Sequence, residues 1–527
     1  MSSENLIIKD WRTIDFSFGL IYPNVYKIGM SSYSIRLLYH LINTYENIAC
    51  ERIFLPERIK YPASTDFSSE GTLRSIENKI LPRDFDILGF SLHFENDYKN
   101  VLWILEKAKI PLTYQKRQEL MSERNDVFPL IIGGGPVITS NPISFSNIFD
   151  LFFIGDAEPN VEPFFNLFSE YKFQKISFQE FITQAKEIDG IFIPSLNNNP
   201  KREVLKNLDD SPIPIYQLSS KVSKDTPIFE NNFFIETNRG CPYQCKFCIS
   251  SFHNSPFRNR SYENIIEAVD KAIQNSKFSA ISLIGSCVSS HPKFKQICEY
   301  IIEKRKRLTL PSLRIDHLTP EIIQILESGD IKTVTIAPEA GSEKLRHSLG
   351  KNFTNEKIIS VLSQIRASKI KNVKFYFLIG LPNEDEEDIN EIITLLKSID
   401  NLGFNNKSLR VNINPFIPKL NTPYEREVNF YFKEEINNFA RKYKKIEREL
   451  KNIPSIKLKS MNFKAIIKNA RLQTMISLGN ILVSDLLLNY YINGGNFGAL
   501  KKAEGDLHFS FEQYLLKIKE GYSPWKL

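Results

Sequence analysis

The sequence predicts an α/β protein with an N-terminal doubly wound (Rossmann-like) parallel sheet, a full or partial (βα)6 TIM-type barrel and a helical C-terminal region. Three observations support this prediction. Short apolar runs alternate with helical patterns, as in parallel sheets covered on both faces. A polar stretch rich in Pro, Asn, Asp and Ser interrupts this alternation between residues 171 and 230. At 527 residues the chain also exceeds one ordinary domain of about 150 residues.

The composition is that of a folded, water-soluble protein. Hydrophobic residues make up 42% and charged residues 24%, which excludes a largely disordered chain. Lys and Arg number 68 against 61 Asp and Glu, and the resulting net charge of +7 is too small to require nucleic acid or an anionic membrane as partner. The first residues lack a signal peptide pattern, and no apolar run approaches the ~18 residues of a spanning helix. We therefore expect a cytoplasmic protein without a membrane partner.

Residues 1–170 are predicted to form the first α/β domain, and residues 171–230 a connector. Candidate strands are Phe16–Tyr22, Phe85–Leu92, Leu130–Ile132 and Leu151–Ile154, and candidate helices are Ser31–Leu41 and Tyr98–Ala108. The polar stretch Thr113–Asp126 is interpreted as an insertion or surface loop.

Residues 231–425 are predicted to form the barrel, and residues 426–527 a helical, partly basic region. Candidate barrel strands are Phe233–Thr237, Ala280–Ile284, Ser312–Ile315, Thr333–Ala337, Val373–Ile379 and Leu409–Ile413. Tyr262–Ile273 has one apolar face, and Ser261 is its expected N-cap. In such barrels the chemistry lies at the C-terminal ends of the strands.

Three of the six cysteines lie together directly after the first barrel strand, in the order C-x3-C-x2-C. Cys241, Cys245 and Cys248 can bind three irons of a [4Fe–4S] cluster and leave the fourth iron open for substrate. The alternative is a structural zinc site with His253 as fourth ligand. Because the motif follows a strand end of a βα repeat, we favour the cluster, with these cysteines as metal ligands and catalytic centre.

With Phe247 before its last cysteine, this motif resembles that of the radical S-adenosylmethionine (SAM) enzymes. The resemblance covers about residues 230–420. It implies that the open iron binds SAM and that an electron from a donor such as ferredoxin or flavodoxin cleaves SAM. The products would be methionine and a 5′-deoxyadenosyl radical, which abstracts hydrogen from a substrate that the sequence does not identify.

Further SAM-contacting positions are implied by the same resemblance, each at a successive strand end. They are Gly285 and Ser286, Arg314, Glu339 in an E-A-G-S turn, and Gly380 in a G-L-P turn. A glycine after a strand is more often a simple turn, and a glutamate there can cap a helix. Cys287, just beyond Gly285, is expected near the mouth of this site; it is interpreted as a small, semi-buried thiol, with a reactive role as the alternative.

The N-terminal region resembles a subgroup of radical SAM proteins with a cobalamin-binding-like domain. The stretches that carry the resemblance are 22–31, 87–92, 131–136 and 153–158. Gly133, Gly134 and Gly135 lie where such domains bring their backbone close to the cofactor. The D-x-H-x-x-G motif that supplies an axial histidine is absent from this region, and His93 is the imidazole nearest to these stretches. Cobalamin is left open: with it the implied reaction is methylation of an unactivated carbon, and without it another radical transformation.

The remaining cysteines narrow the class of enzyme. Cys50 is the only cysteine before the motif and Cys298 the last in the chain. Methylthiotransferases with a second N-terminal cluster and maturases with later auxiliary clusters are therefore disfavoured. The stretch from Arg441 to Arg471 contains eleven Lys or Arg residues and only two Glu. This stretch leaves two alternatives, a radical SAM enzyme acting on RNA and a non-catalytic zinc or RNA-binding protein.

Overall fold

The computed structural model describes residues 6–62, 73–217, 231–459 and 462–527. The chain divides into two compact units. The first unit contains residues 1–230, 475–514 and 523–527, and the second contains residues 231–474 and 515–522. The predicted division into four segments stays a prediction, but the helical C-terminal region contributes to both units.

The first unit is built on a six-stranded sheet in the order β2-β1-β3-β4-β5-β6. The strands are β1 (Phe16–Val25), β2 (Ile48–Leu55), β3 (Ile87–Ser91), β4 (Leu130–Gly134), β5 (Leu151–Phe153) and β6 (Ile191–Phe192). All neighbours pair in parallel except β5 and β6. The predicted doubly wound sheet is confirmed.

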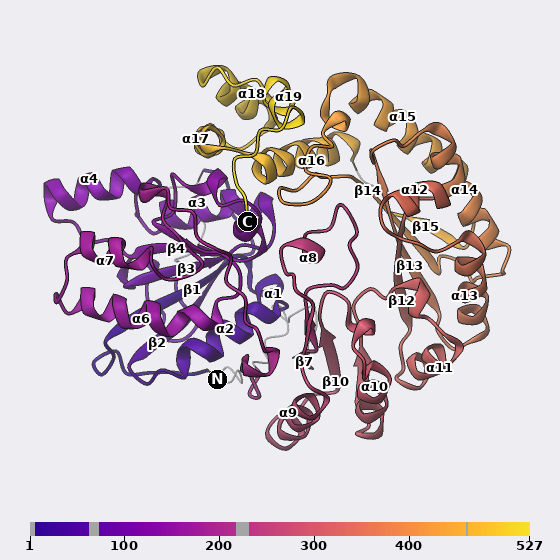
Figure 1. Ribbon diagram of the computed structural model, residues 1–527, viewed down its shortest axis with the longest axis horizontal. Helices are drawn as coiled ribbons and strands as arrows, with labels where there is room; N and C mark the ends of the chain where they lie inside the picture. Colours follow the sequence, from indigo (N-terminus) through magenta and orange to yellow (C-terminus); the bar gives the residue numbers. More distant parts are fainter. Residues whose placement is uncertain (1–5, 63–72, 218–230, 460–461) are drawn as a thin grey trace. The chain divides into compact units, whose positions relative to one another are not determined.

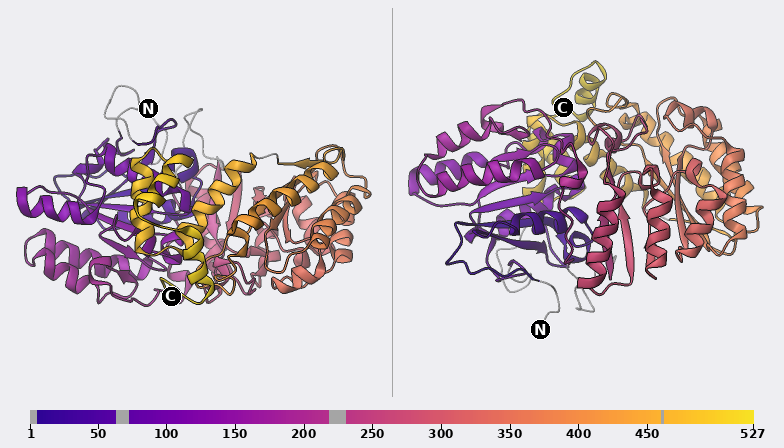
Figure 2. Two further views of the ribbon diagram at one scale, coloured as in Figure 1. Left: turned by 90° about the horizontal axis from the view of Figure 1, so that it is seen from above. Right: turned by 60° about the horizontal axis from the view of Figure 1, so that its bottom comes forward.

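Helices cover both faces of this sheet (Figures 1 and 2). On one face α2 (Tyr33–Asn43), α6 (Glu158–Lys172) and α7 (Phe178–Ala185) enclose an aromatic core that includes Phe164 and Phe168. On the other face α3 (Tyr98–Lys107) contacts α17 (Ile481–Ile492). Because α2 follows β1 and α3 follows β3, the chain winds in opposite directions from these two adjacent strands.

Three features of the first unit differ from the predictions. The strand β2 was not expected, because its Glu51 and Arg52 interrupt the apolar pattern. In the structure both side chains are buried, and Arg52 forms an ion pair with the buried Glu77 at 2.8 Å. The predicted loop at 113–126 contains α4 (Tyr114–Arg124), which Thr113 caps by accepting from the backbone N–H of Lys116. The connector contains α7, whose capping box at Ser177 was overlooked.

The second unit is a partial barrel of two parallel sheets. One has the order β11-β10-β7 and the other β12-β13-β14-β15, while β8 and β9 form a short antiparallel pair. The strands are β7 (Asn232–Glu236), β8 (Asn238–Arg239), β9 (Arg258–Asn259), β10 (Ala280–Ile284), β11 (Arg307–Thr309), β12 (Thr333–Glu339), β13 (Asn372–Ile379), β14 (Leu409–Pro415) and β15 (Ile456–Leu458). The main covering helices are α9 (Tyr262–Asn275), α10 (Phe294–Glu303), α11 (Pro320–Ser328), α13 (Asn355–Ala367) and α14 (Glu386–Asp400).

Most barrel predictions are confirmed, and one strand is wrong. Ser261 caps α9 by accepting from the backbone N–H of Asn264. The third strand is β11, not Ser312–Ile315. Residues 312–315 form an irregular segment that leads into a 3-10 turn at Ile315–His317, which leaves Arg314 beside the strand ends instead of inside a strand.

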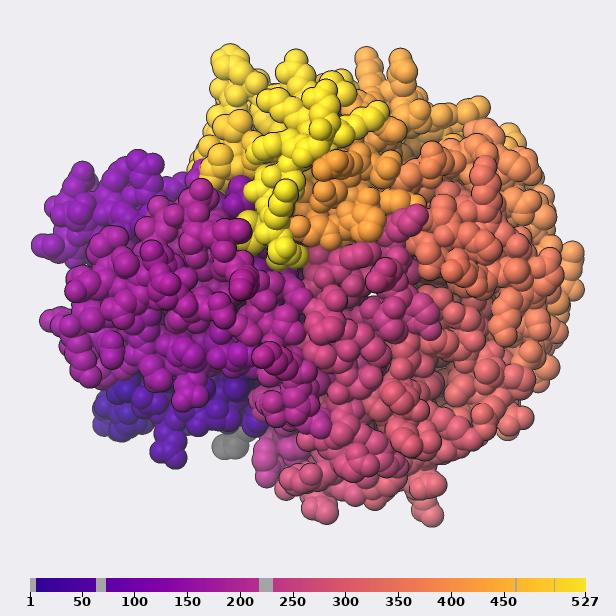
Figure 3. All heavy atoms as spheres, in the orientation of Figure 1, coloured from indigo at the N-terminus to yellow at the C-terminus, as the bar shows by residue number. Residues whose placement is uncertain are grey.

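The helical C-terminal region contains α15 (Lys433–Leu450), α16 (Phe463–Leu478), α17, α18 (Phe497–Asp506) and α19 (Phe511–Lys519). Within the first unit, Asn141 donates to the carbonyl oxygens of Ile476 and Gly479. The buried Trp525 packs on Phe192 with ring centroids 5.0 Å apart, so the end of the chain belongs to this unit. The C-terminal region is yellow in Figure 3.

Short helices complete the fold: α1 (Tyr26–Gly29), α5 (Pro136–Ser140), α8 (Ile249–Phe252) and α12 (Glu343–Ser348). Within the described ranges, no helix combines the length and apolar character needed to cross a bilayer.

Candidate functional site

A cavity of about 170 Å³ in the second unit is lined by most of the residues predicted to bind the cluster and SAM. These are Cys241, Cys245, Phe247, Cys248, Ser286, Arg314 and Glu339. The lining also includes Cys287, which was expected near the mouth of the site. Lys351 and Ser251 line it as well and were not predicted to act there. The tertiary structure therefore brings together side chains that follow four different strands.

The cysteine loop is held in place mainly by its backbone. Gly240 has a φ of 80°, and a Cβ there would lie 2.4 Å from the carbonyl oxygen of Asn254, so only glycine fits this turn. The backbone N–H of Lys246 donates to Leu349 at 3.0 Å, and that of Cys248 donates to Cys245 at 2.9 Å. These bonds fix the loop while leaving its thiols directed at the cavity.

Phe247 anchors the same loop to an apolar cluster. Its ring packs against the buried side chains of Ala340, Leu345, Leu349, Leu381, Phe416 and Tyr424. Tyr424 in turn donates to the carbonyl oxygen of Ser348 at 3.0 Å. An aromatic residue before the last cysteine thus has a packing role, whether or not it contacts a ligand.

The thiols in the cavity influence each other's ionisation. A hydrogen bond between Cys241 and Cys287 raises the pKa of Cys241 and lowers that of Cys287 to about 6. Burial raises the pKa of Cys245, while the nearby Lys351 opposes this. Since iron binds thiolate, Cys241 and Cys245 must release protons when they bind metal.

A second group of polar side chains lies beside the cysteines. Arg314 binds Asp316 through two nitrogens at 2.8 and 3.0 Å, and its guanidinium stacks 3.5 Å from the ring centroid of Tyr243. The Tyr243 hydroxyl hydrogen-bonds His317, which contacts Ser289 through Nδ1 at 2.8 Å. Although burial opposes it, the bonds from Arg314 hold the pKa of Asp316 below its usual value.

Lys351 is the main cavity residue that sequence reasoning missed. Its ammonium donates to Glu339 Oε1 at 3.0 Å and to the carbonyl oxygen of Ala337 at 2.6 Å. Glu339 has a left-handed backbone with a φ of 68°, which is uncommon for a residue with a Cβ. In this conformation its carboxylate accepts the hydrogen bond from the Lys351 ammonium. Lys351 follows Gly350 shortly after the E-A-G-S turn, and only this closeness in sequence could have indicated it.

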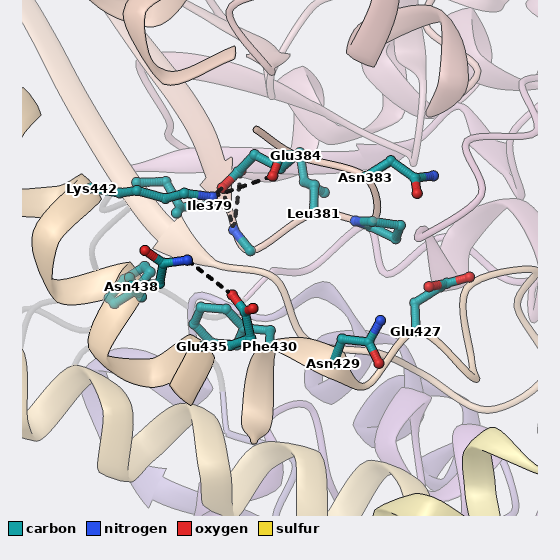
Figure 4. A pocket seen from close by; sticks show the side chains of 13 residues that line it. Ile379, Leu381, Asn383, Glu384, Glu427, Asn429, Phe430, Glu435, Asn438 and Lys442 are labelled. Atoms are coloured by element: carbon teal, nitrogen blue, oxygen red, sulfur yellow. Dashed lines mark hydrogen bonds and ion pairs between the residues drawn. The ribbon is translucent and has the colours of Figure 1, made fainter. Parts of the chain in front are cut away.

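Two of the predicted positions lie outside the cavity lining. A Cβ on Gly285 would lie 2.2 Å from the side-chain oxygen of Asn238, so this glycine allows two segments to pack. Gly380 lines a separate pocket of about 160 Å³, shown in Figure 4. There its N–H donates to Glu384, which also pairs with Lys442 at 2.7 Å. Burial raises the pKa of Glu384, and the Lys442 ammonium opposes this.

The three N-terminal glycines differ from one another. A Cβ on Gly133 would meet the Phe152 ring at 2.6 Å, and one on Gly135 would meet the Leu92 carbonyl oxygen at 2.6 Å. At Gly134 a Cβ would make only an ordinary van der Waals contact, 3.9 Å from the Cβ of Phe153. Packing therefore requires glycine at Gly133 and Gly135 but does not require it at Gly134.

The geometry does not support the zinc alternative. His253 is buried, donates from Nε2 to the carbonyl oxygen of Leu420 at 2.7 Å, and does not line the cavity. Across the described part of the chain, no three or more His, Cys, Asp and Glu side chains are close enough to hold one metal ion. A cluster binds each thiolate through a different iron, so it requires thiols spread around a cavity, as they are here.

Two family models match the chain. "Radical SAM proteins, N-terminal" matches residues 34–194, and "Radical SAM superfamily" matches residues 235–396. An uncharacterized protein of Methanocaldococcus jannaschii is 26% identical over 85% of this chain and 86% of its own length.

Solved structures share the fold at low sequence identity. The cobalamin-dependent SAM radical enzyme OxsB, with aqua-cobalamin bound, aligns with a TM-score of 0.56 at 14% identity, over 94% of this chain and 75% of its own. The radical SAM methyltransferase TsrM of Kitasatospora setae, with tryptophan and a SAM analogue bound, aligns with a TM-score of 0.53 at 14% identity. That alignment covers 78% of this chain and 75% of TsrM.

Proposed function

We propose that this protein, a radical SAM enzyme with an N-terminal B12-binding-like domain, binds one [4Fe–4S] cluster through Cys241, Cys245 and Cys248 and binds SAM beside it. The observation that carries the proposal is the single cavity lined by all three thiols and by the Glu339–Lys351 pair. When bound, the cluster and SAM together supply the radical that abstracts hydrogen from the substrate. An external reductant such as ferredoxin or flavodoxin provides the electron.

The chain's own residues position these groups. Gly240 and the backbone bonds of Lys246 and Cys248 present the three thiols to the cavity. The Lys351 ammonium offers a cation for a ligand carboxylate, and the Glu339 carboxylate offers an acceptor for an amino group. Both are mostly shielded from water, with 11% and 12% of their side chains exposed, which strengthens such contacts. Glu339 and Lys351, together with Ser286 and Arg314 in the lining of the same cavity, are the SAM contacts we propose here.

Cobalamin is the second cofactor of the proposal. The chain shares its fold with OxsB, which has aqua-cobalamin bound, and packing does not require the glycine at Gly134, which lies at a strand end. Bound cobalamin would supply methyl transfer, so we propose methylation of an unactivated carbon as the reaction. Gly133 and Gly135 then support the ligand only indirectly, because a side chain at either position would clash with the rest of the protein.

Anaerobic reconstitution tests the proposal directly. With iron, sulfide and hydroxocobalamin, the protein should retain about four irons and one cobalt per chain and show a broad charge-transfer absorption. With dithionite and SAM it should release 5′-deoxyadenosine. A colourless protein with one zinc per chain would overturn the cluster, and iron without cobalt would overturn the methylation.

The basic stretch adds little support for an RNA substrate. Arg441 and Lys445 both pair with Glu386, at 2.7 and 3.4 Å, and Lys442 pairs with Glu384. The two pairs with Glu386 join α15 to α14, and Glu384 lies just before α14, so part of the positive charge is neutralised within the protein. The RNA-modifying alternative stays a prediction, and a steep fall of RNA affinity with added salt would support it.

A further inference from the structure

His93 lies at the point of the first unit where a doubly wound sheet binds ligands. In the order β2-β1-β3-β4, the chain winds away in opposite directions from β1 and β3. Such sheets bind ligands beyond the carboxyl ends of the two strands at this switch point. His93 follows β3 directly, and its ring lies 5.4 Å from that of Tyr22 on β1. The two rings therefore mark the expected binding edge.

The His93 ring is oriented by two hydroxyl groups. Its Nε2 lies 2.9 Å from Ser34 Oγ on α2 and 3.2 Å from Ser91 Oγ at the end of β3. Ser34 Oγ also lies 2.9 Å from Ser32 Oγ, so the hydroxyl groups form a chain. A histidine that binds a metal through one nitrogen is typically held by a hydrogen bond from the other, which also fixes its tautomer.

The other nitrogen of this ring, Nδ1, differs from Nε2 in its contacts. The structure records no hydrogen bond for His93 Nδ1 within the described residues, and part of the side chain is exposed. Desolvation by the surrounding protein atoms nevertheless lowers the pKa of His93, which keeps the lone pair of the ring available at neutral pH.

We propose that His93 binds the cobalt of cobalamin through Nδ1, as an axial ligand supplied outside the D-x-H-x-x-G motif that this chain lacks. This inference rests on the proposed function, because it requires cobalamin at the first unit. The hydroxyl groups of Ser34 and Ser91 accept the Nε2 proton and hold the ring in position. Packing does not require a glycine at Gly134, on the neighbouring strand β4 at the same edge of the sheet, so a ligand there would explain it.

Electron paramagnetic resonance of bound cob(II)alamin tests this assignment. An axial nitrogen splits the cobalt lines into triplets, and nitrogen-15 converts them to doublets. We expect triplets in the unlabelled holoprotein and doublets after growth on [15N]histidine. The H93Q variant should lose the splitting, and H40Q, which changes a histidine on α2 that lines another pocket, should keep it. Cobalt content is measured on every sample.

The outcomes separate this inference from the proposed function. Bound cobalt with no nitrogen splitting, or with triplets that [15N]histidine leaves unchanged, would overturn the role of His93 and leave cobalamin binding intact. Doublets that persist in H93Q would assign another histidine and also overturn it. If the unsubstituted protein retains no cobalt, both proposals fail. Should H93Q not fold, the labelling of the unsubstituted protein still decides whether a histidine binds cobalt.

Discussion

The cavity of the second unit takes its three predicted cluster ligands from one stretch, Cys241–Cys248, whereas the proposed ligand edge of the first unit takes Tyr22, Ser34 and His93 from three separate elements. In the first case the spacing of residues along the chain already determines which atoms can bind one cluster. In the second, only the order of the strands brings the side chains together. The difference shows why a metal motif can be identified from sequence while a cofactor edge cannot.

The comparison is tested most strongly by removing one thiol. Cys245→Ala should abolish cluster binding, because Cys245 is buried in the cavity and no other side chain can take its place on the loop. Iron content and visible absorption after anaerobic reconstitution measure the effect. Cys298→Ala is the matched control, since Cys298 is also buried but lies on α10 outside the cavity lining. Equal iron in Cys245→Ala and the unsubstituted protein would contradict the assignment.

Two neighbouring glycines distinguish packing from ligand binding in the first unit. Gly135 has a φ of 101° and a Cβ there would meet the Leu92 backbone, so Gly135→Ala should lower the free energy of unfolding by about 2–4 kcal/mol. Gly134→Ala should change it by less than about 1 kcal/mol and instead weaken cobalamin binding. Chemical denaturation and cobalt retention measure the two effects. Equal destabilisation by both substitutions would show that the face at Gly134 is not free.

Asp97, which follows β3 in the first unit, predicts that the stability of the protein depends on pH. Burial raises the pKa of Asp97 to about 7, with Glu95 adding to the shift and Lys99 and the amides of Asn24 and Asn100 opposing it. Because the pKa of Asp97 is higher in the folded than in the unfolded protein, the protonated carboxyl group stabilises the fold. This contribution to the free energy of unfolding is complete below about pH 4 and is lost as the pH rises towards 7.

Asp97→Asn removes the titrating group and should flatten this part of the stability profile, by on the order of 2–3 kcal/mol. Denaturant midpoints measured at several pH values provide the test, and Asp15→Asn, an aspartate before β1, serves as control. An unchanged profile in Asp97→Asn would mean that the Asp97 carboxylate stays ionised throughout.

The smallest of these effects is expected for the affinity for SAM when Lys351 is replaced. Lys351→Met keeps most of the side-chain volume but removes the ammonium that pairs with Glu339, and should raise the dissociation constant of SAM by about tenfold. Calorimetry on the reconstituted protein measures this, with iron content as a check that the cluster persists. Lys357→Met, at an exposed position of α13, should leave the constant unchanged. Unchanged SAM affinity in Lys351→Met would remove this residue from the site.

Several elements could be predicted because their signals are local. Apolar runs identified β10 and β13 within a residue of their observed bounds, and Ser261 identified the start of α9. Elements whose charges are satisfied by distant partners were missed. Arg52 on β2 reads as an exposed residue until Glu77 is placed beside it. The helix α4 was interpreted as a loop because its residues are mostly polar, as in an insertion, and its buried residue is Arg117.

By itself the sequence determined the order of βα units, the cysteine motif and the turns after its strands, because each depends on residues close along the chain. The tertiary structure alone decided which turns face the cavity: Arg314, Glu339 and Lys351 do, while Gly285 and Gly380 pack elsewhere. It also decided that His93 lies beside Tyr22 and Ser34. The physical reason is that parallel strands align their carboxyl ends whatever the distance between them in sequence, and the alignment appears only once the sheet has formed.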